Sequence, residues 1–380
     1  WKYKGMWEDF SGTVGFWADM DQPYVTYHDD YIESEWWALK TIWEKGLLYK
    51  GFKIVPYCPR CGTPLSSHEV AQGYTTVKER SAVVRFKVVG EDAYILAWTT
   101  TPWTLPSNVA LCVNPDETYV KVAAADGRTY YLAEALADKV LGPLGGKETP
   151  AYEVLARFTG KELCGKEYEA LYEGAAKEAA RQHKKAHYVV SDGYVTMTDG
   201  TGIVHIAPAF GEDDARVGRA NDLPLVKFVD ERGYLTDDTP FAGMRAKPSE
   251  AELRKNPPAV SADPAVLADL SERGLLFDAP KFEHEYPFCW RCDTPLIYYA
   301  RESWFIKMTE VREDLIRNNN TVNWIPESIG KGRFGDWLEN VQDWGVSRNR
   351  YWGTPLNIWE CDCGHQECVG SREELKKLSK

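Results

Sequence analysis

Four cysteines in two widely separated pairs offer the clearest chemistry in the sequence: Cys58 with Cys61, and Cys289 with Cys292. Each Cys-x-x-Cys forms a tight turn that aims two thiolates at one point, and two such turns supply the four sulfurs of a tetrahedral zinc site. Zinc binding also keeps the thiols deprotonated at neutral pH. Because four thiolates leave no open coordination position, the predicted zinc is structural rather than catalytic. Four unliganded core cysteines are the alternative.

The two cysteine pairs lie in segments that repeat each other. Residues 56–65 and 287–296 both read Pro-aromatic-Cys-x-Arg-Cys-x-Thr-Pro-Leu. The intervening chain leaves from one half of the predicted zinc site and returns at the other, so its ends must lie close together. This arrangement is typical of a domain inserted into another domain.

A third cluster contains Cys361 and Cys363, with His365 and Cys368 nearby. We interpret it either as half of a second zinc site, whose other ligands would lie beyond Lys380, or as a flexible end with unpaired thiols.

Two segments of the middle region are unusual: Trp98-Thr-Thr-Thr-Pro-Trp-Thr-Leu-Pro-Ser-Asn108 and Gly200-Thr-Gly-Ile-Val-His-Ile-Ala-Pro-Ala-Phe-Gly-Glu-Asp-Asp214. The first offers several hydroxyls and backbone N–H groups after a predicted strand. The second places His205 on a glycine-flanked strand and three acids at a predicted helix start. Each also has an ordinary structural interpretation, as a strand end with threonine–backbone bonds, a structural histidine and helix-capping acids.

Together these two segments closely resemble the editing-domain signatures of isoleucyl-tRNA synthetases. The form Thr-Thr-Thr-Pro-Trp-Thr-Leu-Pro-x-Asn is that of the isoleucyl enzymes, whereas valyl and leucyl relatives carry Thr-Thr-Arg-Pro. The resemblance covers essentially the whole chain: Tyr24–Gly51 is similar to the entry from the catalytic domain, and Trp344–Gly353 to the return. The Cys-x-Cys-Gly-His that follows resembles the eukaryote-like branch of bacterial isoleucyl enzymes.

The resemblance implies proofreading. The His-x-Gly-His and Lys-Met-Ser-Lys-Ser signatures are missing from this sequence, so the implied need for ATP and Mg²⁺ belongs to the full-length parent, and this chain is not expected to charge tRNA. The implied reaction is hydrolysis of valyl-tRNA(Ile), with valyl-adenylate as a second substrate. The implied partners are the valine-bearing 3′ end of tRNA(Ile) and the rest of the synthetase in cis. A non-catalytic tRNA-binding or structural zinc module is the alternative.

The resemblance also implies roles for individual residues. Asp214 is expected to bind the substrate α-ammonium, with Asp213 as the competing candidate, and His205 is expected to line the side-chain pocket. Hydroxyls would position the ester, the ribose and a water that attacks directly, without a catalytic metal. The predicted catalytic residues are Thr99, Thr100, Thr101 and Asp214, and the predicted substrate-binding residues are Trp103, Thr104, Asn108, His205 and Asp213.

The elements that must position these residues change in character along the chain. Residues 1–57 are predicted to be helical, with Ile32, Trp36, Leu39 and Trp43 on one helix face, a capping box at Asp30 and Glu33, and a stop at Gly46. The middle is predicted to hold a half-buried strand over 84–88, a strand over 94–98, hairpins at Asp126-Gly127 and Asp192-Gly193, helices over 134–141 and 169–182, and a surface loop over 240–265.

The expected fold class is α/β (α+β): a β-barrel-like editing domain inserted through a zinc-ribbon stalk into part of a class I Rossmann-type catalytic domain. The expected parts are a helical flank, the first half of the zinc stalk, the editing domain, the second half of the stalk, the return to the catalytic domain, and a truncated second zinc module. They correspond to residues 1–57, 58–75, 76–280, 281–300, 301–360 and 361–380.

Composition limits the classes of partner. A net charge of −12 disfavours wrapping of a long nucleic-acid duplex, and the only basic spots that we nominate for phosphate contact are Lys184-Lys185 and the pair Lys331 and Arg333. The sequence has no signal peptide and no apolar run near 18 residues, so a cytoplasmic protein without membrane partners is expected. The start at Trp1 suggests a piece of a longer protein.

Overall fold

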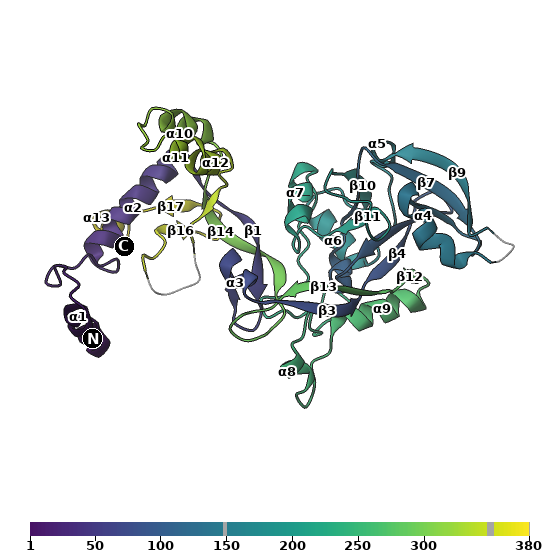
Figure 1. Ribbon diagram of the computed structural model, residues 1–380, viewed down its shortest axis with the longest axis horizontal. Helices are drawn as coiled ribbons and strands as arrows, with labels where there is room; N and C mark the ends of the chain where they lie inside the picture. Colours follow the sequence, from purple (N-terminus) through teal and green to yellow (C-terminus); the bar gives the residue numbers. More distant parts are fainter. Residues whose placement is uncertain (147–149, 348–352, 380) are drawn as a thin grey trace. The chain divides into compact units, whose positions relative to one another are not determined.

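The computed structural model describes residues 1–146, 150–347 and 353–379 (Figure 1). It is a mixed α/β structure that divides into two compact units, one of residues 53–301 and one of residues 1–52 with 302–380. Residues 348–352 of the predicted return segment and Lys380 lie outside the described residues. Over the described residues, no helix combines the length and the apolar character that crossing a membrane requires.

A nine-stranded sheet forms the centre of the unit of residues 53–301 (Figure 1). Its order is β10-β6-β11-β5-β8-β7-β9, with β4 beside β5 and β12 beside β4. Among the described residues the edge strands β10 and β9 do not pair with each other, so the sheet is a curled, open half-barrel. The strands are β4 (Ala82–Lys87), β5 (Tyr94–Thr99), β6 (Ala110–Val113), β7 (Thr118–Ala124), β8 (Thr129–Ala133), β9 (Tyr152–Thr159), β10 (Tyr188–Ser191), β11 (Ile203–Ile206) and β12 (Leu276–Asp278).

Strand β4 is buried on both faces, so the prediction of a half-buried strand is wrong. Val84 and Phe86 belong to one apolar core and Val83 to another. Arg85 is tolerated between them because its guanidinium donates to the Tyr130 hydroxyl at 2.9 Å and to two backbone carbonyls. Satisfied donors remove most of the penalty of burying a charged group.

A long ribbon, a short strand and several helices complete this unit. A two-stranded antiparallel ribbon pairs β3 (Tyr74–Arg80) with β13 (Lys281–Pro287) (Figure 1). The short β2 (Thr63–Pro64) pairs with β1 (Leu48–Cys58). The helices are α3 (Ser67–Ala71), α4 (Glu134–Leu141), α5 (Gly160–Leu163), α6 (Glu173–Arg181), α7 (Glu212–Ala220), α8 (Glu250–Leu253) and α9 (Ala262–Glu272), with 3₁₀ turns η1 (Pro102–Ser107) and η2 (Gly142–Leu144).

The structure confirms some of the local predictions for this unit and contradicts others. The hairpin at Asp126-Gly127 is confirmed by the antiparallel β7–β8 pair, and the strand over 94–98 and the helix over 134–141 are also confirmed. The hairpin at Asp192-Gly193 is wrong, because β10 pairs in parallel with β6. The helix predicted over 169–182 begins only at Glu173. The surface loop over 240–265 is wrong in part, since it contains the buried Phe241 and Ala246.

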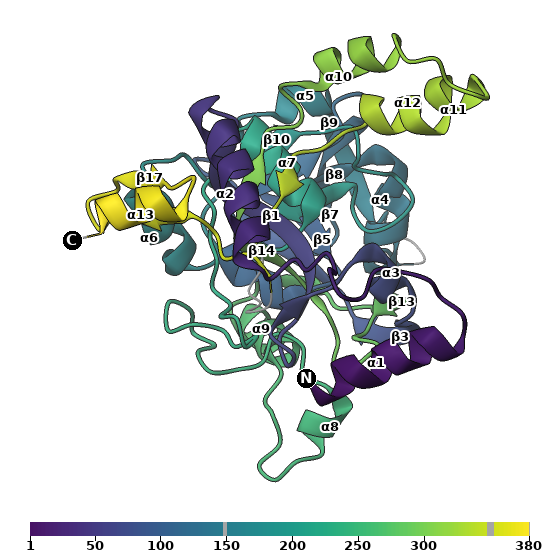
Figure 2. The same cartoon turned by 90° about the vertical axis from the view of Figure 1, so that its left-hand side faces the viewer.

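The unit of residues 1–52 and 302–380 is mainly helical. Its elements are α1 (Lys2–Thr13), α2 (Asp29–Glu44), α10 (Arg312–Asn319), α11 (Ser328–Lys331), α12 (Arg333–Glu339), α13 (Arg372–Leu378), β15 (Trp344–Gly345), β16 (Ile358–Glu360) and β17 (Gln366–Cys368). The hairpin of β16 and β17 lies beside α13 (Figure 2). Ion pairs of Arg372 with Asp29 and Glu33 tie α13 to α2.

The helix predicted from Ile32, Trp36, Leu39 and Trp43 is confirmed as α2, and the chain leaves it through Gly46, whose φ is +70°. The predicted capping box is wrong, because the helix starts two residues earlier, with His28 as its N-cap, and has no side-chain cap. Residues 48–57 are not helical either. They form β1 (Leu48–Cys58), which belongs with β14 (Ile297–Ile306) to a four-stranded sheet of order β15-β14-β1-β2.

Candidate functional site

Two neighbouring parallel strands bring the two unusual segments together. Strand β11 pairs in parallel with β5, with Val204 opposite Trp98. Because the carboxyl ends of adjacent parallel strands meet at one edge of a sheet, Thr99 at the end of β5 and His205 near the end of β11 reach the same edge. The 3₁₀ turn η1 follows β5 there, and the loop that leads to α7 follows β11.

A compact cluster of hydroxyls and one imidazole forms at this edge; we call Thr99, Thr101, Thr104 and His205 the threonine–histidine cluster. The Thr104 Oγ1 lies 2.9 Å from the His205 Nε2. Thr104 also donates to the Thr101 carbonyl at 2.8 Å, and the Thr101 Oγ1 lies 3.3 Å from both the Thr99 and the Thr104 hydroxyl oxygens. Thr99, Thr104 and His205 are buried.

These contacts fix the proton on the imidazole. The Thr104 hydroxyl has one hydrogen, which it donates to the Thr101 carbonyl, so it accepts from the His205 Nε2–H. Burial lowers the pKa of His205 to about 4, so the ring is neutral at pH 7. Its Nδ1 is therefore an acceptor, and it is buried without a hydrogen-bond partner among the described residues.

The bonds within the cluster are not equally strong. O–H···O bonds are usually about 2.5–3.0 Å long, so the two 3.3 Å contacts of the Thr101 hydroxyl are weak. The Thr99 and Thr101 hydroxyls can therefore exchange these contacts for a water or a polar ligand, whereas Thr104 is held firmly against His205. The Thr100 hydroxyl is half-buried and has no hydrogen-bond partner among the described residues.

Trp103 and Asn108 make packing and hydrogen-bond contacts that stabilise the protein around the cluster. The Trp103 ring is buried and packs edge-on against Phe210, with 5.1 Å between the ring centroids, which is a second contact between the two segments. The Asn108 amide donates to the Ala110 carbonyl at 2.9 Å and accepts from the Tyr168 hydroxyl at 2.7 Å. Both ends of the Asn108 side chain are therefore hydrogen-bonded, which fixes the residue that caps the end of η1.

The two acids in question point in different directions. Asp213 is exposed and forms an ion pair with Arg216 at 2.8 Å. Asp214 is half-buried and accepts from the Ala207 N–H at 2.9 Å, and burial raises its pKa to about 7. Gly211 makes this inward turn possible, because a Cβ there would lie 2.9 Å from the Asp214 carboxyl carbon.

No hydrogen bond joins Asp214 to the threonine–histidine cluster among the described residues. The raised pKa means that its carboxyl is close to half-protonated at neutral pH, so a nearby cation would favour its ionised form. Asp213 already has such a cation in Arg216. The two candidates therefore differ in environment, since Asp213 is exposed and paired with a cation, whereas Asp214 turns inward.

The four cysteines Cys58, Cys61, Cys289 and Cys292 form one group, which we call the cysteine cluster. Their sulfurs all lie within 4.8 Å of one another, and three of the sulfur–sulfur distances are 3.4, 3.5 and 4.0 Å. Sulfurs around a tetrahedral zinc lie about 3.8 Å apart for Zn–S bonds of about 2.3 Å. The donor set therefore fits zinc, and these four residues could hold a metal ion.

The repeat explains how the two turns of the cysteine cluster form. Gly62 and Asp293 occupy the same place in the two repeats, and both have a left-handed φ, +68° and +54°. Such residues let the chain curl back after the second cysteine of each pair. Leu65, Val70 and Leu296 pack around the sulfurs.

Cys361 and Cys363 differ from the cysteine cluster. Both are exposed, and their sulfurs lie 3.0 Å apart in the turn between β16 and β17. Cys368 is buried on β17, and no third ligand joins the pair among the described residues. The second zinc site remains a prediction.

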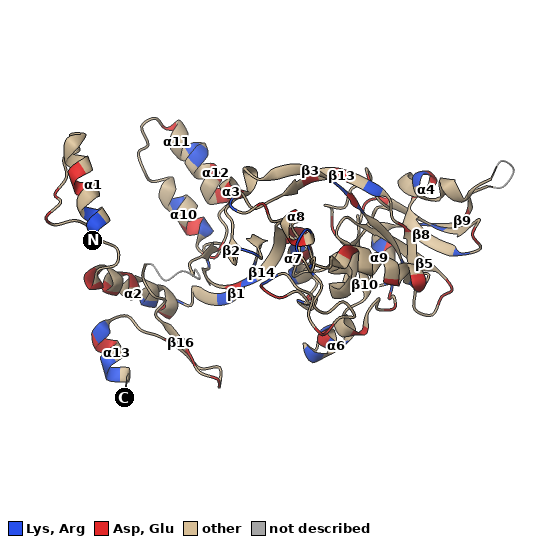
Figure 3. Cartoon of the chain, turned by 90° about the horizontal axis from the view of Figure 1, so that it is seen from below, with Lys and Arg blue, Asp and Glu red and all other residues tan. Residues whose placement is uncertain are grey.

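The nominated basic spots are largely paired with acids. Lys184 pairs with Asp222 at 2.7 Å and Lys185 with Glu167 at 2.8 Å. Lys331 pairs with Glu327. Basic and acidic residues also alternate along α6 and α13 in Figure 3. Phosphate binding at these lysines would have to displace existing ion pairs.

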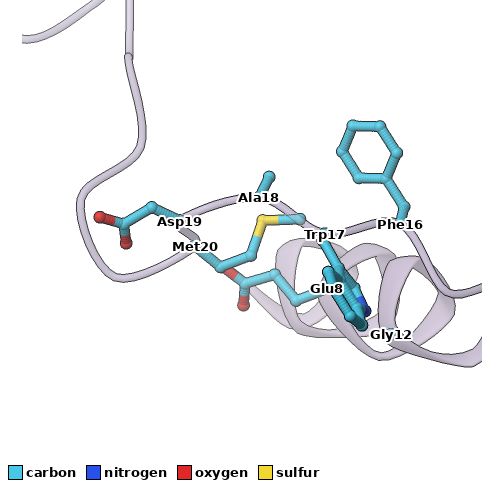
Figure 4. Close-up of a pocket in the computed structure, with 7 residues that line it drawn as sticks. All are labelled: Glu8, Gly12, Phe16, Trp17, Ala18, Asp19 and Met20. Atoms are coloured by element: carbon cyan, nitrogen blue, oxygen red, sulfur yellow. The ribbon is translucent and has the colours of Figure 1, made fainter.

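Two surface depressions lie away from these residues. One, of about 510 Å³, is formed by Glu8, Gly12 and the loop of residues 16–20 (Figure 4). The other, of about 890 Å³, lies between α6 and residues 237–240. None of the predicted site residues lines either depression.

Sequence reasoning missed the residues that hold η1 in place. Asp263 accepts from the Trp103 N–H at 2.9 Å, and Tyr168 donates to Asn108. Asp263 lies 160 positions from Trp103 in a region predicted to be surface loop. No pattern of spacing in the sequence connects the two residues.

Comparison with known proteins places the chain in a family. The family model of class I tRNA synthetases (I, L, M and V) matches residues 1–380. The isoleucine–tRNA ligase of Clostridium novyi (strain NT) is 56% identical over 378 residues, which cover 99% of this chain and 34% of that protein. Isoleucine–tRNA ligase 2 of Bacillus thuringiensis subsp. konkukian is 48% identical over 380 residues, again covering 99% and 34%.

The chain thus spans about a third of the length of the curated relatives it matches. Among solved structures, the editing domain of the P. knowlesi cytosolic leucyl-tRNA synthetase matches 40% of this chain and 66% of that one, with 18% identity and a TM-score of 0.31. A TM-score of this size does not establish a shared fold. The sequence relatives confirm the resemblance to isoleucyl-tRNA synthetases.

Proposed function

Since the chain belongs to the class I tRNA synthetases of the isoleucine, leucine, methionine and valine group, we propose that it carries the proofreading part of an isoleucyl-tRNA synthetase. The proposed reaction is hydrolysis of valyl-tRNA(Ile), with valyl-adenylate as a second substrate. The parent enzyme would ligate isoleucine to tRNA(Ile) with ATP and Mg²⁺, in the cytoplasm. The observation that carries the proposal is the threonine–histidine cluster, where the two editing-like segments meet.

The proposed selectivity is that of a second sieve. Isoleucine and valine differ by one methylene, from which a pocket gains only about 1–3 kcal/mol, a figure known from isoleucyl-tRNA synthetases themselves. A hydrolytic pocket that admits valine and excludes isoleucine would supply the remaining discrimination. His205 is the proposed wall of that pocket, because its buried, neutral ring is fixed by Thr104 and cannot swing aside without losing this bond.

The proposed chemistry is direct attack by water. The water oxygen forms a bond to the ester carbonyl carbon, the bond to the ribose oxygen breaks, and the water proton ends on that oxygen. The products are valine and uncharged tRNA. The weakly engaged Thr99 and Thr101 hydroxyls would orient the water and the ester, and Asp214 in its ionised form would bind the α-ammonium.

We propose a purely structural role for zinc in the cysteine cluster, as a cross-link between the two ends of the editing domain. The zinc-ribbon stalk and the insertion into a Rossmann-type catalytic domain are part of the same proposal. Their support is the sulfur geometry and the repeat. No step of the proposed hydrolysis uses the metal.

The test is single-turnover release of the amino acid from valyl-tRNA(Ile) and from isoleucyl-tRNA(Ile) by the 380-residue chain. Faster release of valine than of isoleucine is expected. Equal release of both would contradict the sieve. Release of neither, with tRNA binding retained, would favour the alternative of a non-catalytic tRNA-binding module.

A further inference from the structure

The backbone N–H of Trp103 is held by a carboxylate from a distant helix. Thr101 is the N-cap residue of η1 and provides no side-chain cap, and Pro102 has no N–H to donate. The Trp103 N–H is therefore the first donor of the turn, and it donates to the Asp263 Oδ1 at 2.9 Å. An uncapped donor in a buried turn is costly, so this contact replaces the missing local cap.

Asp263 is held in turn by a buried ammonium. The Lys247 Nζ lies 3.0 Å from the Asp263 Oδ2 and 2.7 Å from a carboxylate oxygen of Glu79 on β3. The Lys247 side chain is only 4% exposed and lies over the Tyr286 ring, 5.3 Å from its centroid. A lysine this deeply buried requires partners for its charge.

Lys247 and Asp263 are connected to the threonine–histidine cluster through Trp103. Trp103 immediately precedes Thr104, and the Thr104 hydroxyl is the group that bonds the His205 Nε2. A shift of η1 would therefore move Thr104 away from His205 and alter the position of the ring. Outside the two segments, Asp263 holds the start of η1, and Tyr168 holds Asn108, the residue that follows its end.

We infer that Lys247 and Asp263 are positioning residues for the proposed deacylation. They fix η1 so that Thr101, Thr104 and His205 hold their relative places when a substrate displaces the weak hydroxyl contacts. They touch neither the proposed substrate nor the attacking water. Glu79 anchors the pair to the ribbon of β3 and β13.

The experiment compares Asp263→Ala, Asp263→Asn and Lys247→Met in the 380-residue chain. One readout is deuterium uptake of the peptide of residues 99–107, which does not depend on activity. The other is the single-turnover rate and half-saturation concentration for valyl-tRNA(Ile), and this kinetic readout rests on the proposed function. The matched control is Glu252→Gln, which perturbs the neighbouring buried pair of Glu252 with Arg245 at 2.7 Å without a contact to η1.

Asp263→Ala is expected to raise deuterium uptake in residues 99–107 and to slow valine release by about a hundredfold, since small misplacements are expensive in catalysis. Asp263→Asn is expected to slow it by only about tenfold, because an amide oxygen still accepts from the Trp103 N–H. The half-saturation concentration for valyl-tRNA(Ile) should change little in either variant. Lys247→Met should resemble Asp263→Asn, and Glu252→Gln should change neither readout.

Uptake in Asp263→Ala that equals that of the wild type, or of Glu252→Gln, would overturn the inference. So would an Asp263→Asn variant as slow as Asp263→Ala, because a graded loss is what distinguishes positioning from general destabilisation. If the wild type releases no valine while Asp263→Ala still raises uptake in residues 99–107, the proposed function fails and the positioning role stands.

Discussion

The cysteine cluster and the threonine–histidine cluster are both assembled from two segments far apart in sequence, but they are completed differently. The cysteine cluster contains every ligand that a tetrahedral zinc needs, and each ligand comes from one of the two repeats. The threonine–histidine cluster is held by residues outside its two segments, among them Asp263 and Tyr168. A metal site can be closed by its own motif, whereas a site that must bind a substrate keeps weak contacts and relies on its surroundings.

The strongest way to test this contrast is to break the cysteine cluster. Cys58→Ser removes one of the four sulfurs of the cluster, so zinc should be lost and the melting temperature should fall by about 10 °C or more. Zinc content by mass spectrometry and thermal unfolding by circular dichroism check both. Cys164→Ser, at an exposed cysteine, is the control. Full zinc content in Cys58→Ser would show that the cluster is not the metal site.

The second test concerns Asp214, whose pKa is raised to about 7, chiefly by burial. Because the folded state holds its proton more tightly than the unfolded chain, the stability from this group is present below about pH 4 and is lost as pH rises through 7. Asp214→Asn should therefore gain stability relative to the wild type between pH 5 and pH 8, on the order of 2 kcal/mol. Urea unfolding at both pH values measures this gain, and parallel pH profiles would contradict the raised pKa.

A third test compares the two cysteine groups. Cys361 is exposed, and among the described residues no third metal ligand joins Cys361 and Cys363. Cys361→Ser should therefore lower the melting temperature by less than about 2 °C and leave the zinc content unchanged. A loss of zinc comparable to that of Cys58→Ser would establish the second zinc site.

The smallest effect is expected at Asp213. Its ion pair with Arg216 is exposed, and such pairs contribute about 0.5 kcal/mol or less. Asp213→Asn should therefore change stability little. Because the Asp213 charge raises the pKa of Asp214 less than burial does, Asp213→Asn should flatten the Asp214 pH dependence only slightly. Urea unfolding of the single and double variants checks this, and a profile flattened as strongly by Asp213→Asn as by Asp214→Asn would contradict burial as the chief cause of the raised pKa.

The features that could be predicted from the sequence are those whose determining residues lie close together in the chain. The turns of the cysteine cluster, the hairpin at Asp126-Gly127 and the helix face around Trp36 all depend on residues within one short stretch. Arg85 shows the opposite case, because the groups that allow its burial come from Tyr130 and from residues 274 and 276. Only the folded chain reveals such partners.

The candidate site shows the same division. The two motifs identified Thr99, Thr104 and His205 as residues of interest, but the hydrogen bond between Thr104 and His205 depends on the parallel pairing of β5 and β11. The role of Asp263 depends on a contact across 160 positions. Periodicity and motif spacing carry no information about contacts of this kind.

The most direct test of the account is the rate of valine release from valyl-tRNA(Ile) by Thr104→Val, with zinc content and melting temperature measured on the same sample. The substitution keeps the side-chain shape and leaves the His205 Nε2–H without its acceptor. Release should fall by about a hundredfold, as for loss of one positioned polar group in a catalytic site, while zinc content stays unchanged. Thr196→Val, at an exposed hydroxyl, is the control. Wild-type release by Thr104→Val would contradict the assignment of the chemistry to the threonine–histidine cluster.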